Sequence, residues 1–117
     1  MSEILQISIK RTEKDTCELF VSGQMEASGA EVFKSACSDC LQKEARHLII
    51  DLSKVTVISS SGIGALMVLQ EDCQDRGGRA DYVALSREVQ AVVRLLDLES
   101  ILNIDQNKTG AMQGNQP

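Results

Sequence analysis

"LIIDLSKVTVISSSGIGALMVLQ", residues 48–70, is the stretch of sequence that decides the fold of this chain. Three hydroxyl side chains, Ser59 to Ser61, and two glycines separate one apolar run from another. The run before the serines, residues 47–52, is almost continuously apolar, as in a strand buried on both faces of a sheet. The run after them is long enough for a helix that ends at Gly77 and Gly78. The stretch therefore predicts a strand, a serine loop and a helix.

The rest of the chain repeats this alternation. "SGAE", Ser28 to Glu31, is a capping-box signature that opens a helix running to about Glu44. Period-two patterns and apolar runs predict further strands at residues 4–10, 17–23, 80–85 and 100–104. Ser86 is placed to cap a last helix, whose apolar stripe comprises Val89, Val92, Val93 and Leu96.

These elements predict a single α/β domain over residues 1–105, with a mixed β-sheet and helices packed on it. A chain of 117 residues, 43% hydrophobic and 25% charged, agrees with one soluble domain that buries a core. Residues 106–117 are polar and glycine-rich, and we expect them to form a disordered tail.

Composition excludes several classes of function. A net charge of -5 and a pI near 4.8 argue against a nucleic-acid binder, which needs a basic face. No apolar run approaches the ~20 residues that span a bilayer, so direct membrane insertion is not expected. The N-terminus has no signal-peptide pattern, and we expect a cytoplasmic protein.

The cysteines and the histidine are assigned to packing rather than to chemistry. Cys37 and Cys40 form a C-x-x-C pair, but with Phe33 and Leu41 they fall on one stripe of an amphipathic helix. Cysteine in such a stripe behaves as a small hydrophobe. His47 has no second histidine with which to bind a metal. The sequence predicts no metal site, no cofactor and no catalytic residue.

The three serines lie where a buried strand gives way to a helix, the place where open α/β sheets put functional loops. We expect Ser61 to cap that helix by accepting from the N–H of Ile63 or Gly64. Gly62 and Gly64 have no Cβ, so another molecule can approach, and a helix N-terminus favours a phosphoryl group. The Ser61 hydroxyl is therefore a candidate for covalent phosphorylation, with plain capping as the alternative.

The helix after the serines is apolar on every side, although a helix that lies on a sheet needs only one apolar stripe. Its surplus side, with Ala65, Val68 and Leu69, must pack on a neighbouring helix or meet a partner. A modifiable polar end beside an apolar patch would make a docking surface that modification can switch.

These segments resemble a known family. "HLIIDLSKVTVISSSGIGALMVL", residues 47–69, is similar to the signature of STAS domains, especially bacterial anti-sigma factor antagonists. That signature is an apolar strand, "DLS", then "DSSG" or "DSTG" followed by "IG" or "LG". Residues 20–34 resemble the family's "GELD" segment, with "QME" at residues 24–26 in place of E, L and D. Residues 84–104 resemble the late helix and final strand, so the likeness covers about residues 4–105.

The resemblance implies a partner switch without enzymatic activity. In the family, the unmodified antagonist binds an anti-sigma factor that is a serine kinase, and this frees the sigma factor. The kinase phosphorylates the antagonist, which releases the complex, and a metal-dependent serine phosphatase resets it. The matching phosphorylated residue is Ser61, with Ser60 as the second choice. The implied partner-binding residues are Glu26, Ser59, Ser60, Gly62, Ile63, Gly64, Ala65 and Val68.

One position departs from the family pattern. The family usually has an aspartate where this chain has Ser59, so a charge that could contact the kinase is missing. Glu26 in place of aspartate preserves the charge near the first helix. The alternative function is a STAS subunit of a membrane transporter or of another signalling assembly, which neighbouring genes would distinguish. A small enzyme is disfavoured because no base is positioned for a serine nucleophile, and the sequence assigns no oligomeric state.

Overall fold

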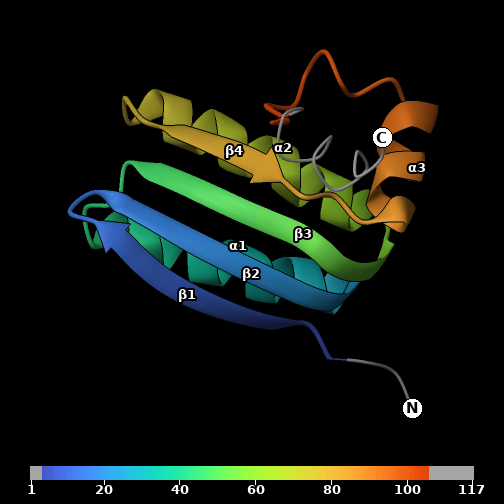
Figure 1. Cartoon of the computed structure of the whole chain (residues 1–117), viewed down its shortest axis with the longest axis horizontal. Coiled ribbons are helices and arrows are strands. Elements are labelled where there is room, and N and C mark those ends of the chain that lie inside the picture. The colour runs from blue at the N-terminus through green and yellow to red at the C-terminus, as the bar shows by residue number, and fades with distance from the viewer. Residues whose placement is uncertain (1–3, 106–117) are drawn as a thin grey trace, which may run out of the picture.

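The computed structural model describes residues 4–105, and Figure 1 shows how its elements are arranged. The predicted tail, residues 106–117, lies outside the described residues. In chain order the elements are β1 (Gln6–Glu13), β2 (Thr16–Met25), α1 (Ala27–Gln42), β3 (His47–Ile58), α2 (Ser60–Asp75), β4 (Arg79–Val83) and α3 (Arg87–Leu95).

The strands form one mixed sheet in the order β1-β2-β3-β4, which confirms the predicted fold class. β1 and β2 are antiparallel neighbours joined by a short turn. The pairs β2–β3 and β3–β4 are parallel, and α1 and α2 provide their connections. Both helices lie behind the sheet in Figure 1, so they cover the same face of it.

β3 is an inner strand of the sheet, but only one of its faces is fully buried. Leu48, Ile50 and Leu52 point into the core and have no exposed surface. Ile49 and Asp51, which alternate with them, are partly exposed. The predicted burial on both faces is wrong because α1 and α2 pack on a single face of the sheet.

α1 begins without a side-chain cap. Glu26 occupies the N-cap position, and its side chain makes no capping hydrogen bond. Ser28 lies inside the first turn of the helix, so the predicted capping box of Ser28 and Glu31 is wrong. The physical reason is that β2 continues to Met25 and leaves a single residue between strand and helix.

All three helices end in the same kind of left-handed turn. Glu44, Gly77 and Asp97 have φ values of 73°, 78° and 56°. After each helix the backbone makes the pair of hydrogen bonds that defines a Schellman motif. The predicted end of α2 at Gly77 and Gly78 is confirmed, and α1 ends at Gln42. In the described part of the chain, none of the helices is both long and apolar enough to cross a membrane.

The last helix has the predicted cap. The Ser86 Oγ accepts a hydrogen bond from the Val89 N–H at 3.2 Å. Val89 and Val93 are buried, whereas Leu96, predicted as the last member of the stripe, lies at the C-cap and is 52% exposed.

The predicted strand at residues 100–104 is reduced to one bridge, between Ile104 and Tyr82 of β4. The side chain of Gln70 in α2 holds residues 101–103, just before this bridge, by two hydrogen bonds. The Gln70 Nε2 donates to the Ile101 carbonyl at 2.6 Å, and its Oε1 accepts from the Asn103 N–H at 2.5 Å. Gln70 is buried, so these two bonds satisfy its amide group.

All four cysteines are part of the core. Burial raises the pKa of the Cys37 thiol, and burial raises the pKa of Cys40, which lies beside Cys17, to about 11. Burial also raises the pKa of Cys73 to about 11. Because thiolates are the reactive form, the raised pKa values make Cys37, Cys40 and Cys73 poor nucleophiles at neutral pH. The prediction that Cys37 and Cys40 pack in the core is confirmed.

Tyr82 connects β4 to α2. Its side chain has no exposed surface, and its hydroxyl donates to the Leu66 carbonyl at 2.5 Å. Burial raises the pKa of Tyr82 well above its ordinary value. The buried phenol therefore stays protonated and ties β4 to the middle of α2.

Candidate functional site

The serines lie at the carboxyl edge of the sheet, where β3 ends and α2 begins. Ser59 is the N-cap of α2, and its Oγ accepts from the Gly62 N–H at 3.5 Å. The same hydroxyl donates to the Met25 carbonyl at 3.4 Å, and the Ser59 N–H donates to that oxygen at 3.1 Å. Ser59 therefore caps the helix, and the predicted cap at Ser61 is wrong.

Strand pairing decides which of the three serines becomes the cap. β3 stays paired with β2 as far as Ile58, which is the register partner of Met25. Ser59 is thus the first residue free to leave the sheet. Its φ and ψ of -102° and -179° are the extended values typical of an N-cap.

Ser60 and Ser61 are the first two residues of α2, and both are exposed. Because Ser59 takes the capping role, neither of these hydroxyls is needed to begin the helix. The unpaired N–H groups of the first turn give this end a partial positive charge. A negatively charged group on Ser61 would therefore find a favourable potential and leave the cap undisturbed.

The two glycines after the serines have different roles. A Cβ at Gly62 would lie 2.5 Å from the carbonyl oxygen and the Cγ of Met25, and 2.8 Å from Ile58 Cγ1. A Cβ at Gly64 would meet nothing within 4 Å. Gly62 therefore lets α2 pack closely on the end of the sheet, and Gly64 leaves the outer surface open.

Glu26, the residue after β2, lies at the same carboxyl edge of the sheet as the serines. Glu26 directly follows Met25, whose carbonyl accepts both hydrogen bonds from Ser59. Its side chain is exposed, and within residues 4–105 its carboxylate makes no hydrogen bond or ion pair. We call Glu26 and Ser59 to Gly62 the serine pole.

The outward side of α2 is apolar beyond the serine pole. Val68 is 48% exposed and Met67 38%, and with Gly64 and Ile101 they line a hollow of about 400 Å³. Ala65 and Leu69, which the sequence placed on the surplus side of this helix, are buried. Val68 alone of the three predicted surplus residues is available to another molecule.

The structure separates the predicted partner-binding residues by exposure. Gly62, Ile63 and Ala65 are buried, so they lie beneath the surface that a partner would contact. Ser59 and Gly64 are partly exposed. The residues that a partner can contact freely are Glu26, Ser60, Ser61 and Val68.

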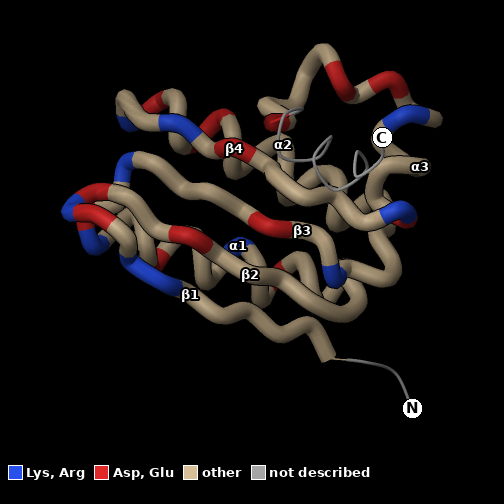
Figure 2. Tube along the Cα trace, viewed as in Figure 1, with Lys and Arg blue, Asp and Glu red and all other residues tan. Residues whose placement is uncertain are grey.

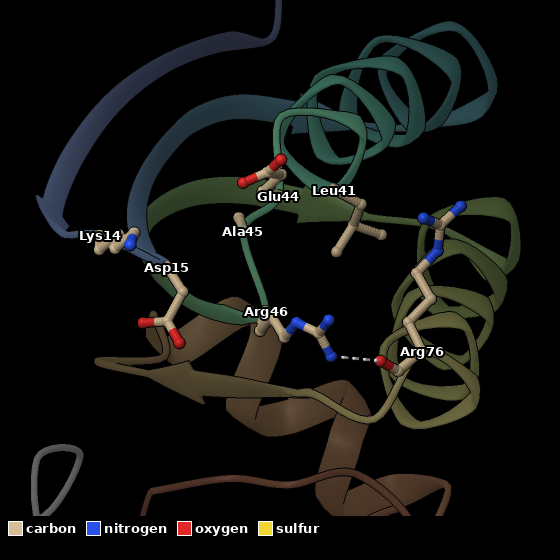
Figure 3. Close-up of a pocket in the computed structure, with 7 residues that line it drawn as sticks. All are labelled: Lys14, Asp15, Leu41, Glu44, Ala45, Arg46 and Arg76. Atoms are coloured by element: carbon tan, nitrogen blue, oxygen red, sulfur yellow. Dashed lines mark hydrogen bonds between the residues drawn. The ribbon is translucent and has the colours of Figure 1, made fainter.

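A larger hollow, of about 790 Å³, lies at the other end of α2, and none of the predicted site residues lines it. Figure 3 shows that its lining comes from the β1–β2 turn and from the ends of α1 and α2. The Arg46 Nη1 donates to the Arg76 carbonyl at 3.1 Å and so provides a partner for one carbonyl group at the C-terminus of α2. Charged residues of both signs gather at this end in Figure 2. The lining includes Lys14, Asp15, Glu44, Arg46 and Arg76.

His47 belongs to a charged network near this hollow. Its Nε2 lies 2.7 Å from the Asp81 Oδ2, and the Arg79 Nη2 lies 2.8 Å from the Asp81 Oδ1. Partial burial opposes ionisation of Asp81, but the hydrogen bonds from Arg79 and His47 outweigh it and lower its pKa. Within residues 4–105, no three His, Cys, Asp or Glu side chains gather in a way that could hold a metal ion. The hollow and this network together form the charged pole, which no local sequence motif indicated because its residues come from separate turns.

Relatives of known name match nearly the full length of the chain. The anti-sigma-B factor antagonists of Listeria monocytogenes and Listeria innocua are each 29% identical over 111 residues. The match covers 95% of this chain and 96% of each relative.

Solved structures share the fold. An anti-sigma factor antagonist from Mycobacterium paratuberculosis has a TM-score of 0.77 and 18% identity, with all of both chains covered. The anti-sigma factor antagonist SpoIIAA in its unphosphorylated form has a TM-score of 0.72 and 14% identity, over 96% of this chain and 98% of that one. The phosphorylated form of the Bacillus SpoIIAA has a TM-score of 0.67 and 14% identity, over 92% and 98% of the two chains.

The family model that matches the chain is consistent with these likenesses. The STAS domain model matches residues 6–111, a span that begins at β1 and includes every strand and helix described above. The chain belongs to the STAS domain family.

Proposed function

We propose that this chain is an anti-sigma factor antagonist that works by partner switching. It binds an anti-sigma factor, itself a serine kinase, while Ser61 is unmodified, and phosphorylation of Ser61 releases it. A metal-dependent serine phosphatase then restores the binding form. The chain acts in the cytoplasm as a binding module and as a substrate of the kinase, and it has no catalytic residue of its own.

The observation that carries the proposal is the exposed Ser61 in the first turn of α2. The hydroxyl is accessible, the cap is provided by Ser59, and an exposed apolar side chain, Val68, lies about two turns further along the same helix. The relatives named anti-sigma-B factor antagonist support the assignment, as does a protein of this fold that has been solved in unphosphorylated and phosphorylated forms.

The size of the electrostatic terms explains how one phosphoryl group can switch binding. Phosphorylation adds about -1.5 to -2 charges at pH 7. The N-terminus of α2 stabilises such a group by only about 0.3–1 kcal/mol, so the free domain keeps its fold. Burying the same dianion against an apolar partner surface costs several kcal/mol unless a cation meets it. The larger effect is therefore on the interface.

Ser59 preserves part of what an aspartate would do at its position. Serine and aspartate are comparably good N-caps, and Ser59 makes the capping bond to Gly62. α2 therefore begins at the same residue with either side chain. The negative charge is what this chain lacks at position 59, so any contact of that charge with the kinase must be made by another residue.

The first experiment identifies the modification. The chain is incubated with Mg-ATP and each purified anti-sigma serine kinase of the source genome, and its intact mass is measured. We expect one added phosphoryl group, mapped to Ser61. Ser61→Ala should abolish it, and Ser60→Ala should retain it, because the two exposed serines are matched controls for each other. Modification at Ser60 alone, or none with any kinase, would contradict the proposal.

The second experiment measures the switch. Unmodified chain and Ser61→Ala should bind the kinase with equal affinity, and phosphorylated chain should bind at least about a hundredfold more weakly, equivalent to ~2.8 kcal/mol. Ser61→Asp should be intermediate because it carries less charge and fewer acceptor oxygens. Equal affinities for all four forms would leave Ser61 as a surface serine without a switching role.

A further inference from the structure

β1 is an edge strand, and within residues 4–105 it has a pairing partner on one side only. That partner is β2, whereas β4, at the opposite edge of the sheet, is bridged on its outer side by Ile104. Figure 1 shows β1 along the border of the sheet, far from α2. An unpaired edge presents a row of N–H and C=O groups with which another strand can pair.

The hydrophobic core is incomplete at this edge. Ile9 lies opposite the fully buried Leu19 of β2, yet its own side chain is 48% exposed. In the helix layer, Val32 of α1 is 46% exposed. A Cβ at Gly29 would lie 3.4 Å from the Leu5 Cβ, and Val32 is three residues further along the helix, on the same side as Gly29. Apolar side chains of the sheet and of the helix are therefore exposed together along β1.

The charges that usually protect an edge strand are used inside this fold. The Arg11 Nη2 donates to the Lys43 carbonyl at 2.9 Å, just after the end of α1. Lys10 lies opposite Glu18 of β2, which offsets its charge. β1 contains no proline, and its register with β2 is regular over residues 6–10. This part of the strand is thus a regular edge on which a second strand can pair.

β1 is complementary to itself in one antiparallel register. With Ser8 on the two-fold axis, Ile7 of each copy lies opposite Ile9 of the other, on the face of the sheet that carries the core. Gln6 lies opposite Lys10 on the other face, so no two like charges face each other. Moving the axis to Lys10 would place two lysines opposite each other, which is destabilising. The apolar pattern and the charges therefore select the same register.

We propose that two copies of this chain form a symmetric dimer by pairing their β1 strands in the register centred on Ser8. The two four-stranded sheets then make one continuous sheet, and the interface covers Ile9 and includes Val32 of both copies. α2 packs against β3 and β4, so each copy keeps its serine pole exposed. The dimer does not depend on the proposed function, and it presents two serine poles to a partner.

The first test measures the mass of the full chain by analytical ultracentrifugation. The mass should rise from 12.7 kDa toward twice that value as the concentration increases from about 1 µM to 1 mM, the range of dissociation constants of weak complexes. Ile9→Lys should raise the dissociation constant at least about tenfold, because a charge then faces Ile7. Ile101→Lys is the matched control: its side chain is 49% exposed and distant from β1, so the variant should dimerise like wild type.

Circular dichroism should show that both lysine variants are folded, since the replaced side chains are half-exposed. A wild-type monomer at every concentration overturns the inference and leaves this edge to a strand of another protein. Dimers that Ile101→Lys abolishes and Ile9→Lys preserves also overturn it, as do masses that grow beyond the dimer, because paired β1 strands leave no further edge of this kind. None of these results bears on phosphorylation of Ser61.

Cross-linking tests the register. The natural cysteines are all buried, so a single introduced thiol is the accessible one. Ser8→Cys should form a disulfide-linked dimer on mild oxidation with diamide, because directly opposite side chains have Cβ atoms only about 4.5–5.5 Å apart. Gln6→Cys, on the same face of β1, is the matched control and should stay monomeric, since its counterpart lies beyond the reach of a disulfide. Equal cross-linking of the two variants, or cross-linking of Gln6→Cys alone, overturns the inference.

Discussion

The serine pole and the charged pole lie at the two ends of α2, and they differ in how closely they are packed and in the charges they carry. The serine pole is closely packed, and its serines and glycine are neutral. The charged pole has the larger hollow, of about 790 Å³, and carries lysine, arginine, aspartate and glutamate. One of its arginines, Arg46, donates to a carbonyl at the C-terminus of α2, and another, Arg79, pairs with the Asp81 carboxylate.

The proposed site therefore coincides neither with the larger hollow nor with the denser group of charges. At the charged pole, Arg46 bonds to a backbone carbonyl (Figure 3), and His47, Arg79 and Asp81 bond to one another. The serine pole has accessible hydroxyls, a helix N-terminus and one unpaired carboxylate. Those are the groups on which a phosphoryl transfer and a docking partner can act.

Gly62→Ala tests the close packing of the serine pole and should have the largest effect. Its Cβ would meet the Met25 carbonyl at 2.5 Å, so α2 must shift away from the sheet. We expect the free energy of unfolding in urea to fall by about 1–3 kcal/mol. Gly64→Ala is the control, since its Cβ meets nothing within 4 Å and alanine favours a helix by about 0.5–1 kcal/mol. Equal stability of the two variants would contradict the packing difference.

Val68→Glu tests whether docking extends from the serine pole along α2. The side chain is 48% exposed, so the domain should fold normally. Affinity for the anti-sigma partner should fall about tenfold, or ~1.4 kcal/mol, because a charge replaces an apolar contact. Lys14→Glu, which changes the charge even more but at the charged pole, should bind like wild type. If Lys14→Glu has the stronger effect in calorimetric titration, the functional roles of the two poles are reversed.

Ser59→Ala sharpens the comparison by removing the cap alone. Unfolding free energy should fall by about 1 kcal/mol, a typical value for loss of a serine N-cap. Ser59→Asp should be as stable as wild type because aspartate also caps. Urea denaturation of the three proteins decides the matter, and an alanine variant of undiminished stability would show that Ser59 contributes no cap.

The smallest expected effect is that of acid on the stability that Asp81 contributes at the charged pole. The folded pKa of Asp81 is lowered, so its stabilising contribution is present above the ordinary aspartate pKa of about 3.9 and is lost as pH falls through the folded pKa. The stability gap between wild type and Asp81→Asn should therefore be constant near neutrality and narrow below about pH 4. Urea unfolding at pH 7, 5 and 3 measures that gap, and a gap that widens in acid would reverse the assigned sign.

The order of strands and helices could be predicted from the sequence because periodicity and caps are local signals. Ser86 shows this well: its own neighbours form the helix it caps, and its role is confirmed. The cap of α2 could not be predicted in the same way. Three consecutive serines are locally equivalent, and the choice of Ser59 depends on how far β3 stays paired with β2.

The site was predictable to the same extent. A run of serines and glycines before an apolar helix predicted a candidate site at the start of that helix, and the structure places the serines at the N-terminus of α2. The exposure of single residues was not predictable, because Ala65 and Val68 both look like surplus apolar residues until α1 is placed beside α2. The family resemblance implied a role for Glu26, but its adjacency to Ser59 follows from the register of Met25 and Ile58, a contact between distant parts of the chain.

Tyr82 gives this molecule a built-in optical reporter. The chain contains one tyrosine and no tryptophan, so its near-ultraviolet absorbance and fluorescence come almost entirely from this residue. The hydrogen bond from the phenol to the Leu66 carbonyl places the chromophore against the backbone of α2. Any loosening of that helix from β4 should shift the tyrosine spectrum without an attached dye. Because burial raises the pKa of Tyr82, the red-shifted absorbance of tyrosinate should develop in alkaline titration only when the helix detaches.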